Sequence, residues 1–421
     1  MQNRIFLQVL SLFALIVLAT GLFGFSGKPG RKNFETFMHR QDSLVMVAYE
    51  KRDVPGCHKL IEEAETEFHA LKQSERDNYV WMMAAVYYNY ACLLSLENKK
   101  EDALNFLEMA VKYGYSNYSH MQTDSDLDAI RNMPRYAIIV NQIRAVGDYL
   151  YILKNAGPYH NTENMPLPAF TYQSASDPNL TALRLTYKLD SVAGNGSEVS
   201  RIINLMHWIH DRVPHNGNMG NPSQRNAADL LQICSAEKRT LNCRGLATVL
   251  NEMYLSMGFA SRLVTCLPKD SLNNDFDCHV INAVYSTSLH KWLWMDPTND
   301  AYVMDENNNL LSIQEVRSRL IAGLPLKINE SANWNHREQT TVENYLYNYM
   351  AKNLYMLQCA TQSCYDYETA KRGKTTSYVQ LIPSGFYKFK PGHNRKKLKN
   401  NRHHETWFTC NETLFWVAPA K

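Results

Sequence analysis

A cysteine, a histidine and an aspartate follow one another in contexts that suit acyl-transfer chemistry. They are Cys243 in Leu-Asn-Cys-Arg-Gly-Leu-Ala, His279 in Asp-Cys-His-Val-Ile-Asn-Ala-Val and Asp296 in Trp-Met-Asp-Pro-Thr-Asn-Asp. A thiol attacks a carbonyl carbon as the thiolate, a neighbouring imidazole accepts its proton, and a carboxylate orients the imidazole and stabilises its cationic form. The three residues therefore predict a nucleophile, a base and an orienting acid.

The cysteine stands at the start of a predicted helix. Apolar residues recur at three- and four-residue steps as far as Met257, Gly258 follows as a stop signal, and Asn242 is the expected N-cap. A thiol in the first turn lies near unpaired N–H groups and the positive end of the helix dipole, which favour the thiolate. The same N–H groups can stabilise an oxyanion.

The histidine and the aspartate stand on a predicted hairpin. The runs 279–285 and 291–296 are rich in branched and aromatic residues, as strands are. With a two-residue turn between them, the first residue of the first run lies opposite the last residue of the second, at a Cβ separation of about 4.5 to 5.5 Å. This register brings an imidazole within reach of a carboxylate.

These motifs carry a resemblance to a known family. Residues from about 180 to 303 resemble the transglutaminase-like superfamily, whose papain-related core has a cysteine at a helix start and a histidine and an aspartate on adjacent strands. The stretch from Asn195 to His215 resembles that family's lead-in helix, and the stretch from Gly258 to Val264 resembles the strand that follows the cysteine helix.

The resemblance implies an α+β fold in which a helix carrying Cys243 packs on an antiparallel sheet carrying His279 and Asp296. It makes Cys243 the nucleophile, His279 the base and Asp296 the orienting residue. Many family members have an aromatic residue two positions after the histidine, where this chain has Ile281. No side-chain donor to an oxyanion is implied, and Trp208 is a distant candidate.

The same residues allow other interpretations. A zinc site has the right atom types in Cys234, Cys243, Cys278 and His279, but these residues contain no Cys-x-x-Cys or His-x-x-x-His pair. We therefore expect neither a metal nor a cofactor. Trp292 and Trp294 share a strand face with Asp296, where they either shield the site from water or fill the core.

The chain of 421 residues is long enough for several domains. We expect an apolar N-terminal segment over 1–27, a helical domain over 40–150 and a linker rich in Pro, Asn and Ser over 151–180. A transglutaminase-like catalytic domain over 181–325 and a C-terminal extension with strands over 326–421 follow. One of these expected strands is the run Leu414-Phe-Trp-Val.

The N-terminal segment predicts an extracytoplasmic protein. Residues Ile5 to Phe25 are almost wholly apolar and follow Arg4, as in an export signal or a single membrane anchor. The length favours an anchor, whereas Gly24-Phe-Ser26 offers small residues for cleavage. Secretion, a periplasmic location and attachment at the cell surface all remain open.

The helical domain contains one repeat-like unit. From Ala84 to Tyr115 the alternation of large and small residues resembles a tetratricopeptide unit, in which Ala91, Ala103 and Ala110 lie where two helices meet. A degenerate helix pair precedes it around 42–74. Such a domain offers a surface for a protein partner, and a plain helical bundle is the alternative.

The overall charge argues against a nucleic-acid partner. The chain has 44 Lys and Arg against 41 Asp and Glu, and no fold signature of nucleic-acid binding accompanies them. Seven basic residues fall between Lys388 and Arg402, where an exposed loop between strands is the expected structure.

Together these features predict an exported thiol enzyme that acts on peptide, amide or glutaminyl carbonyls through an acyl-enzyme on Cys243. Hydrolysis is slightly favoured over transfer to an amine, because water is always present and transfer needs an amine site. The alternative is a non-catalytic binding or scaffold protein that retains the transglutaminase-like core and works through its helical N-terminal domain.

Overall fold

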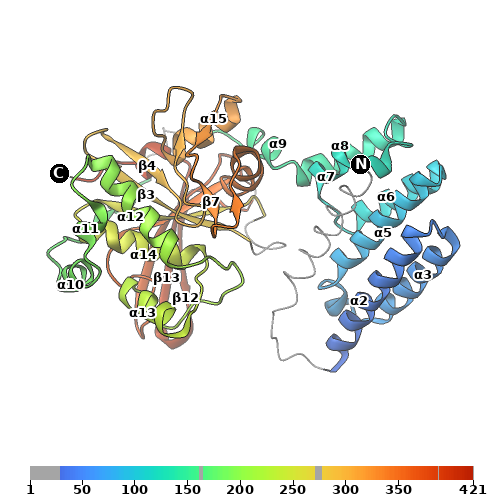
Figure 1. Ribbon diagram of the computed structural model, residues 1–421, viewed down its shortest axis with the longest axis horizontal. Coiled ribbons are helices and arrows are strands. Elements are labelled where there is room, and N and C mark those ends of the chain that lie inside the picture. Colours follow the sequence, from blue (N-terminus) through green and yellow to red (C-terminus); the bar gives the residue numbers. More distant parts are fainter. Residues whose placement is uncertain (1–28, 161–164, 271–276, 387, 421) are drawn as a thin grey trace. The chain divides into compact units, whose positions relative to one another are not determined.

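A computed structural model describes residues 29–160, 165–270, 277–386 and 388–420. The chain forms two compact units, which meet in sequence between Ile152 and Leu153 (Figure 1). The apolar segment Ile5 to Phe25, expected to be an export signal or an anchor, lies outside the described residues. Among the helices that are described, none combines the length and the apolar character needed to cross a bilayer.

The first unit is helical, as expected for this part of the chain. Its longer helices are connected by short turns and shorter helices. In chain order the helices are α2 (Pro29–Glu50), α3 (Val54–Ala70), α4 (Gln73–Arg76), α5 (Val80–Leu96), α6 (Lys100–Lys112), α7 (Tyr118–Thr123), η1 (Ser125–Leu127) and α8 (Pro134–Gly147). Helix α9 (Tyr149–Lys154) spans the boundary between the units.

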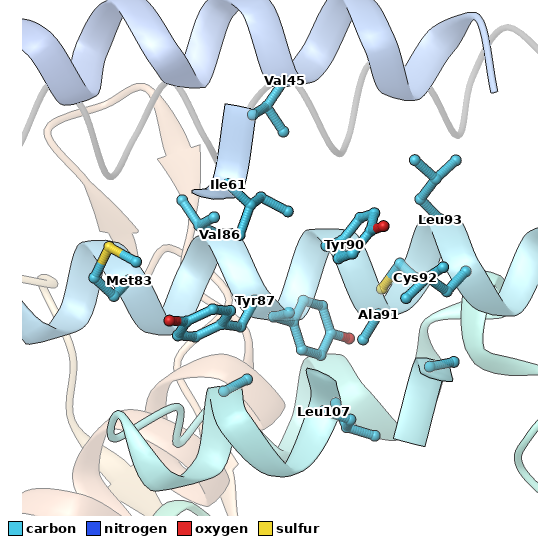
Figure 2. Packing of buried hydrophobic residues seen from close by; sticks show 14 of the residues in the cluster. Val45, Ile61, Met83, Val86, Tyr87, Tyr90, Ala91, Cys92, Leu93 and Leu107 are labelled. Atoms are coloured by element: carbon cyan, nitrogen blue, oxygen red, sulfur yellow. The ribbon is translucent and has the colours of Figure 1, made fainter. Parts of the chain in front are cut away.

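Helix α5 forms the centre of this unit. Its sequence is apolar or aromatic on almost every face, so it can be buried on all sides. Figure 2 shows side chains of α5, such as Tyr87 and Ala91, between residues from α2 and α3 on one side and Leu107 of α6 on the other. Ala91, Ala103 and Ala110 are fully buried, so small residues line the place where α5 and α6 meet. The tetratricopeptide-like and plain-bundle interpretations both predict this packing.

The second unit is built around a seven-stranded sheet with the strand order β12-β13-β11-β9-β2-β3-β4. Neighbouring strands are antiparallel except for β11 and β13, which are parallel. The strands that carry the site, β3 and β4, pair antiparallel, as expected. The strands are β2 (Ser261–Leu267), β3 (His279–Ser286), β4 (Lys291–Met295), β9 (Met356–Ala360), β11 (Thr375–Leu381), β12 (Gly392–Lys397) and β13 (His403–Thr409).

Helices and short strand pairs surround this sheet. The helices are α10 (Pro178–Thr186), α11 (Leu189–Ala193), α12 (Glu198–Arg212), α13 (Ala227–Glu237), α14 (Cys243–Ser256), α15 (Ile313–Ala322), η2 (Glu343–Met350), α16 (Ala351–Asn353), η3 (Lys399–Asn401) and α17 (Glu412–Phe415). The short strands are β1 (Thr171–Tyr172) with β10 (Gln362–Ser363), β5 (Val303–Met304) with β6 (Lys327–Ile328), and β7 (Asn333–Trp334) with β8 (Glu338–Gln339).

Helix α14 is the main support of the site, because it packs directly on β2 and β3 and is flanked by α12 and α13 (Figure 1). The apolar residues that predicted this helix, including Leu246, Val249 and Met253, are buried in one core with residues of α12 and β3. The hydroxyl of Tyr254 also donates to the carbonyl of Ile202 at 3.0 Å and joins α14 to α12. The expected order of a helical region followed by a helix on a sheet is confirmed.

The residues after 326 contribute to this same sheet. They supply β9, β11, β12 and β13, so the expected C-terminal extension shares a sheet with the strands that carry the site. The run 414–417 was expected to be a strand, which is wrong. It begins within the short helix α17, which Asn411 caps by accepting from the backbone N–H of Leu414, and Phe415 of this helix is buried. The basic run 388–402 includes the exposed edge strand β12, where charged residues discourage pairing with another chain.

Candidate active site

The thiol of Cys243 lies in the first turn of α14. The side chain of Asn242 caps this helix by accepting from the backbone N–H of Gly245 at 3.0 Å, as the sequence predicted. The Sγ atom of Cys243 lies 3.9 Å from the carbonyl oxygen of Cys278, the residue before His279. The first N–H groups of a helix have no partner within it. Those of Cys243 and Arg244 can therefore donate to the oxyanion that forms when this sulfur attacks a carbonyl group.

The structure places His279 and Asp296 in direct contact. His279 Nε2 donates to Asp296 Oδ2 at 2.7 Å, and the two side chains are only 2% and 0% exposed. The other ring nitrogen of His279, Nδ1, is then left for the Cys243 thiol, whose pKa His279 lowers. His279 therefore acts on both Cys243 and Asp296.

The hairpin that carries this pair has a different register from the one expected. Ser286 pairs with Lys291, so four residues, not two, lie between the paired ends, and extending the register places residue 279 opposite residue 298. The shift is two residues, which preserves the face on which every side chain lies. His279 and Asp296 are thus diagonal neighbours on one face, close enough for their side chains to meet.

Asp296 accepts hydrogen bonds from four groups. Besides His279, they are the hydroxyl of Tyr345 at 2.5 Å, Nδ2 of Asn299 at 3.0 Å and the backbone N–H of Thr298 at 2.8 Å. Burial opposes ionisation of this carboxyl, but the positive charge of His279 and the hydrogen bonds outweigh it and lower the pKa of Asp296 to about 2. The carboxylate is therefore ionised and held in one orientation.

The electrostatics of the pair favour ionisation of the thiol. Burial opposes the Cys243 thiolate, yet interactions with His215 and His279 lower the pKa of Cys243 to about 6. Burial also opposes a charged His279, but Asp296 and the thiolate raise the pKa of His279 to about 10. Between these values the stable form is a thiolate beside an imidazolium, which is the reactive form of a cysteine nucleophile.

A second histidine, His215, also lowers the pKa of Cys243. Its Nδ1 accepts from the indole Nε1–H of Trp334 at 3.0 Å, which leaves Nε2–H as the donor. The backbone of His215 is held by Asn335, which accepts from its N–H at 2.7 Å and donates to its carbonyl at 2.9 Å, and by a bridge to Leu241. His215 therefore offers a fixed N–H beside the sulfur.

Sequence reasoning missed His215, although it ends the lead-in stretch by which the family was recognised. The signal was its place just after the Val213-Pro214 exit from α12, where the chain must turn back toward the start of α14. Trp208, the distant candidate for an oxyanion donor, has its ring against Tyr187 and Arg212. His215, in contrast, lowers the pKa of the Cys243 thiol.

Two tyrosines of the π-helix η2 complete the surroundings of the triad. Tyr345 donates to Asp296 and accepts from the indole N–H of Trp294 at 3.1 Å, so Trp294 acts on the site through this tyrosine. The ring of Tyr349 lies edge-on to the ring of His279, with centroids 5.3 Å apart. The wider turns of a π-helix are often found at functional sites. Trp292, the other tryptophan of β4, instead donates to the carbonyl of Trp416.

The remaining cysteines differ from Cys243 in their ionisation. Burial raises the pKa of Cys278 to about 11 and that of Cys234 to about 11, and it raises the pKa of Cys266 well above its usual value. No disulfide links any of the nine cysteines, all of which lie in the described residues. Cys243 is therefore the cysteine whose surroundings favour a thiolate.

Comparison with known proteins identifies the region that holds this site. Residues 186–297 match the transglutaminase-like superfamily. One similar solved structure, from Cytophaga hutchinsonii, is named a "putative cysteine protease"; it is 20% identical, covers 38% of this chain, and has a TM-score of 0.23. The match spans 49% of that protein, about half of its length. No curated protein matches this chain significantly.

Proposed function

We propose that this chain, whose residues 186–297 form a transglutaminase-like domain, is a thiol enzyme that cleaves amide bonds in peptides or in glutaminyl side chains. One observation carries the proposal: the thiol of Cys243 lies 3.9 Å from the carbonyl oxygen of Cys278, next to His279, which is hydrogen-bonded to the buried carboxylate of Asp296. A buried charged pair beside an ionised thiol is costly for a purely structural core and is the arrangement that nucleophilic catalysis needs.

The first half of the proposed reaction forms an acyl-enzyme. The Cys243 thiolate attacks the amide carbonyl carbon, and the carbonyl electrons move to the oxygen. The resulting oxyanion accepts hydrogen bonds from Nε2–H of His215 and from N–H groups at the start of α14. The imidazolium of His279 then protonates the leaving nitrogen, the C–N bond breaks, and a thioester remains on Cys243.

The second half releases the acyl group. His279, now neutral, takes a proton from water as the water oxygen attacks the thioester carbonyl. The C–S bond breaks, a carboxylic acid is released, and the thiolate and imidazolium are restored. A primary amine can replace water and would give a new amide. We favour hydrolysis because water needs no dedicated binding site, and we propose that the reaction takes place outside the cytoplasm.

A peptide library separates these outcomes. The full chain is incubated with the library and a labelled primary amine, and the products are read by mass spectrometry. Cleaved or deamidated peptides support hydrolysis, and peptides carrying the amine support transfer. Cys243→Ala is the control and should give neither product. If iodoacetamide labels Cys243 no faster than a free thiol and no product forms, the proposal fails, and a non-catalytic binding role becomes the better account.

A further inference from the structure

A second cluster of polar side chains lies on the same unit. His210 and Asp211 lie in the last turn of helix α12, and His336 lies on the turn between β7 and β8. One potential ligand atom from each of these residues lies within 4.8 Å of the other two. In the described part of the chain, no other three His, Cys, Asp or Glu residues form such a group. His336 Nε2 lies 3.3 Å from Asp211 Oδ1, and the two imidazole centroids are 4.8 Å apart.

The surroundings of His210 provide an independent observation. Its buried ring has Nδ1 at 3.1 Å from the carbonyl oxygen of Pro297 and Nε2 at 3.0 Å from Oδ1 of Asn333. The side-chain amide of Asn333 cannot be flipped, because its Nδ2 donates to the carbonyl of Ser331 and its Oδ1 accepts from the N–H of His336. Both ring nitrogens therefore face acceptors, although a neutral imidazole has one N–H.

This arrangement leaves Nε2 of His210 facing Asn333 with no hydrogen between them. With Nδ1–H donating to Pro297, the lone pair of Nε2 points toward the lone pairs of Asn333 Oδ1. A cation beside Nε2 would interact favourably with both atoms, and it would also use the facing atoms of Asp211 and His336.

We propose that His210, Asp211 and His336 bind a divalent transition-metal cation of the zinc class. Two imidazoles and one carboxylate are ligands that Zn²⁺ prefers, with a fourth position left for water or the oxygen of Asn333. The bond from His210 Nδ1–H to the carbonyl of Pro297 is the contact that commonly orients a metal-bound histidine. The inference goes beyond the proposed function, since none of the three ligands belongs to the catalytic triad.

A cation at this site would join the β7–β8 hairpin to α12. That hairpin carries Trp334 and Asn335, the residues that hold the ring and the backbone of His215. His336 and Asn335 both have left-handed backbone angles, with φ of 55° and 54°, which non-glycine residues adopt at a cost. Metal binding would thus stabilise a strained turn that orients the proposed oxyanion donor.

The test measures metal binding in a chain that cannot catalyse. Full-length protein carrying Cys243→Ala, which removes the reactive thiol, is titrated with Zn²⁺ by calorimetry. We expect one saturable site, and we expect His336→Ala and Asp211→Asn each to weaken binding by at least the roughly 10- to 100-fold that loss of a partner behind a metal ligand costs. Both residues are more than half exposed, so their substitution should not disturb folding. A Co²⁺ titration should lack the intense charge-transfer absorption of cobalt–thiolate bonds, which excludes the remaining cysteines.

A matched control is available in the helical unit. His58 Nε2 lies 3.5 Å from Glu62 Oε1, and both side chains are also exposed, but no second histidine among the described residues completes a group there. His58→Ala should leave the affinity unchanged. The proposal is overturned if the parent protein shows no saturable binding, or if His336→Ala and Asp211→Asn bind Zn²⁺ as tightly as the parent. The proposed catalysis would be unaffected by that result.

Discussion

The indole Nε1–H of Trp334 donates to Nδ1 of His215 at 3.0 Å, and this bond determines which nitrogen of His215 faces the thiol as a donor. Trp334 has no acceptor on its indole nitrogen, so Nδ1 must be unprotonated and Nε2 must carry the hydrogen. The hydrogen bond between His215 and Cys243 is one of the causes of the low pKa of the thiol. Trp334 is therefore a positioning residue for a group that acts on the nucleophile.

We expect His215→Ala to lower kcat/KM by about 10²- to 10³-fold, because one oxyanion donor is lost. The same change should raise the pKa of Cys243, since a hydrogen bond to the thiolate is removed. Trp334→Phe should have a smaller effect in the same direction, because His215 keeps its ring but is no longer held in one tautomer. Steady-state kinetics and the pH dependence of iodoacetamide labelling measure both effects. An unchanged kcat/KM in His215→Ala would contradict the assignment.

The pH dependence of thiol labelling reports on the ion pair. Because the folded pKa of Cys243 is lowered to about 6 and that of His279 is raised to about 10, the thiolate–imidazolium pair forms as pH rises through about 6 and is lost above about 10. Labelling by iodoacetamide should therefore rise with a midpoint near pH 6. In His279→Ala the midpoint should move to higher pH, since burial then acts on the thiol with less opposition.

Cys278 provides an internal control for this measurement. Burial raises its pKa to about 11, so its labelling should still be rising at high pH while that of Cys243 is complete. Peptide mapping after labelling distinguishes the two sites. A midpoint above pH 8 for Cys243 in the unsubstituted protein would show that the pair does not form.

Much of the site could be predicted because its signals are local. A cap at Asn242 and an apolar period after Cys243 define the helix start, and branched and aromatic residues define the strands at His279 and before Asp296. The contact between His279 and Asp296 was expected from a strand register that differs by two residues from the observed one. It still forms because a shift of two keeps each residue on its face.

The remaining parts of the site depend on residues far apart in sequence. Trp334 meets His215 across 119 positions, and Tyr345 meets Asp296 across 49. No helix or strand period links such pairs, so local patterns cannot predict them. The same reason explains why the role of the residues after 326 was not foreseen, since β9 pairs with β2 from a distant part of the chain. The short helix at Glu412–Phe415 was missed because an apolar run of four residues suits either state.

Tyr345 tests whether a group outside residues 186–297 tunes the triad. Tyr345→Phe removes the hydroxyl that donates to Asp296 Oδ2 and leaves the ring in place. A hydrogen bond to a charged group contributes about 1.5–3 kcal/mol, so we expect kcat to fall by roughly tenfold or more. The alkaline limit of the pH–rate profile should also shift, because a change at Asp296 changes the pKa of His279.

Tyr347→Phe is the matched control for this variant, because Tyr347 is a partly exposed residue on the same π-helix. It should leave both kcat and the pH–rate profile as they are. If Tyr345→Phe lowers thermal stability but leaves the alkaline limit in place, Tyr345 has a structural role only.

The helical unit makes a separate prediction about packing. Ala103 is fully buried where α6 meets α5, so Ala103→Leu must add three carbon atoms to a filled interface. Overpacking of this kind costs about 1–3 kcal/mol, and we expect the free energy of unfolding of this unit to fall by that amount. Ala137→Leu on the exposed face of α8 is the control and should change it by less than about 0.5 kcal/mol. Urea denaturation followed by circular dichroism measures both, and equal stability of the two variants would show that the small residues are not needed for close packing of α5 and α6.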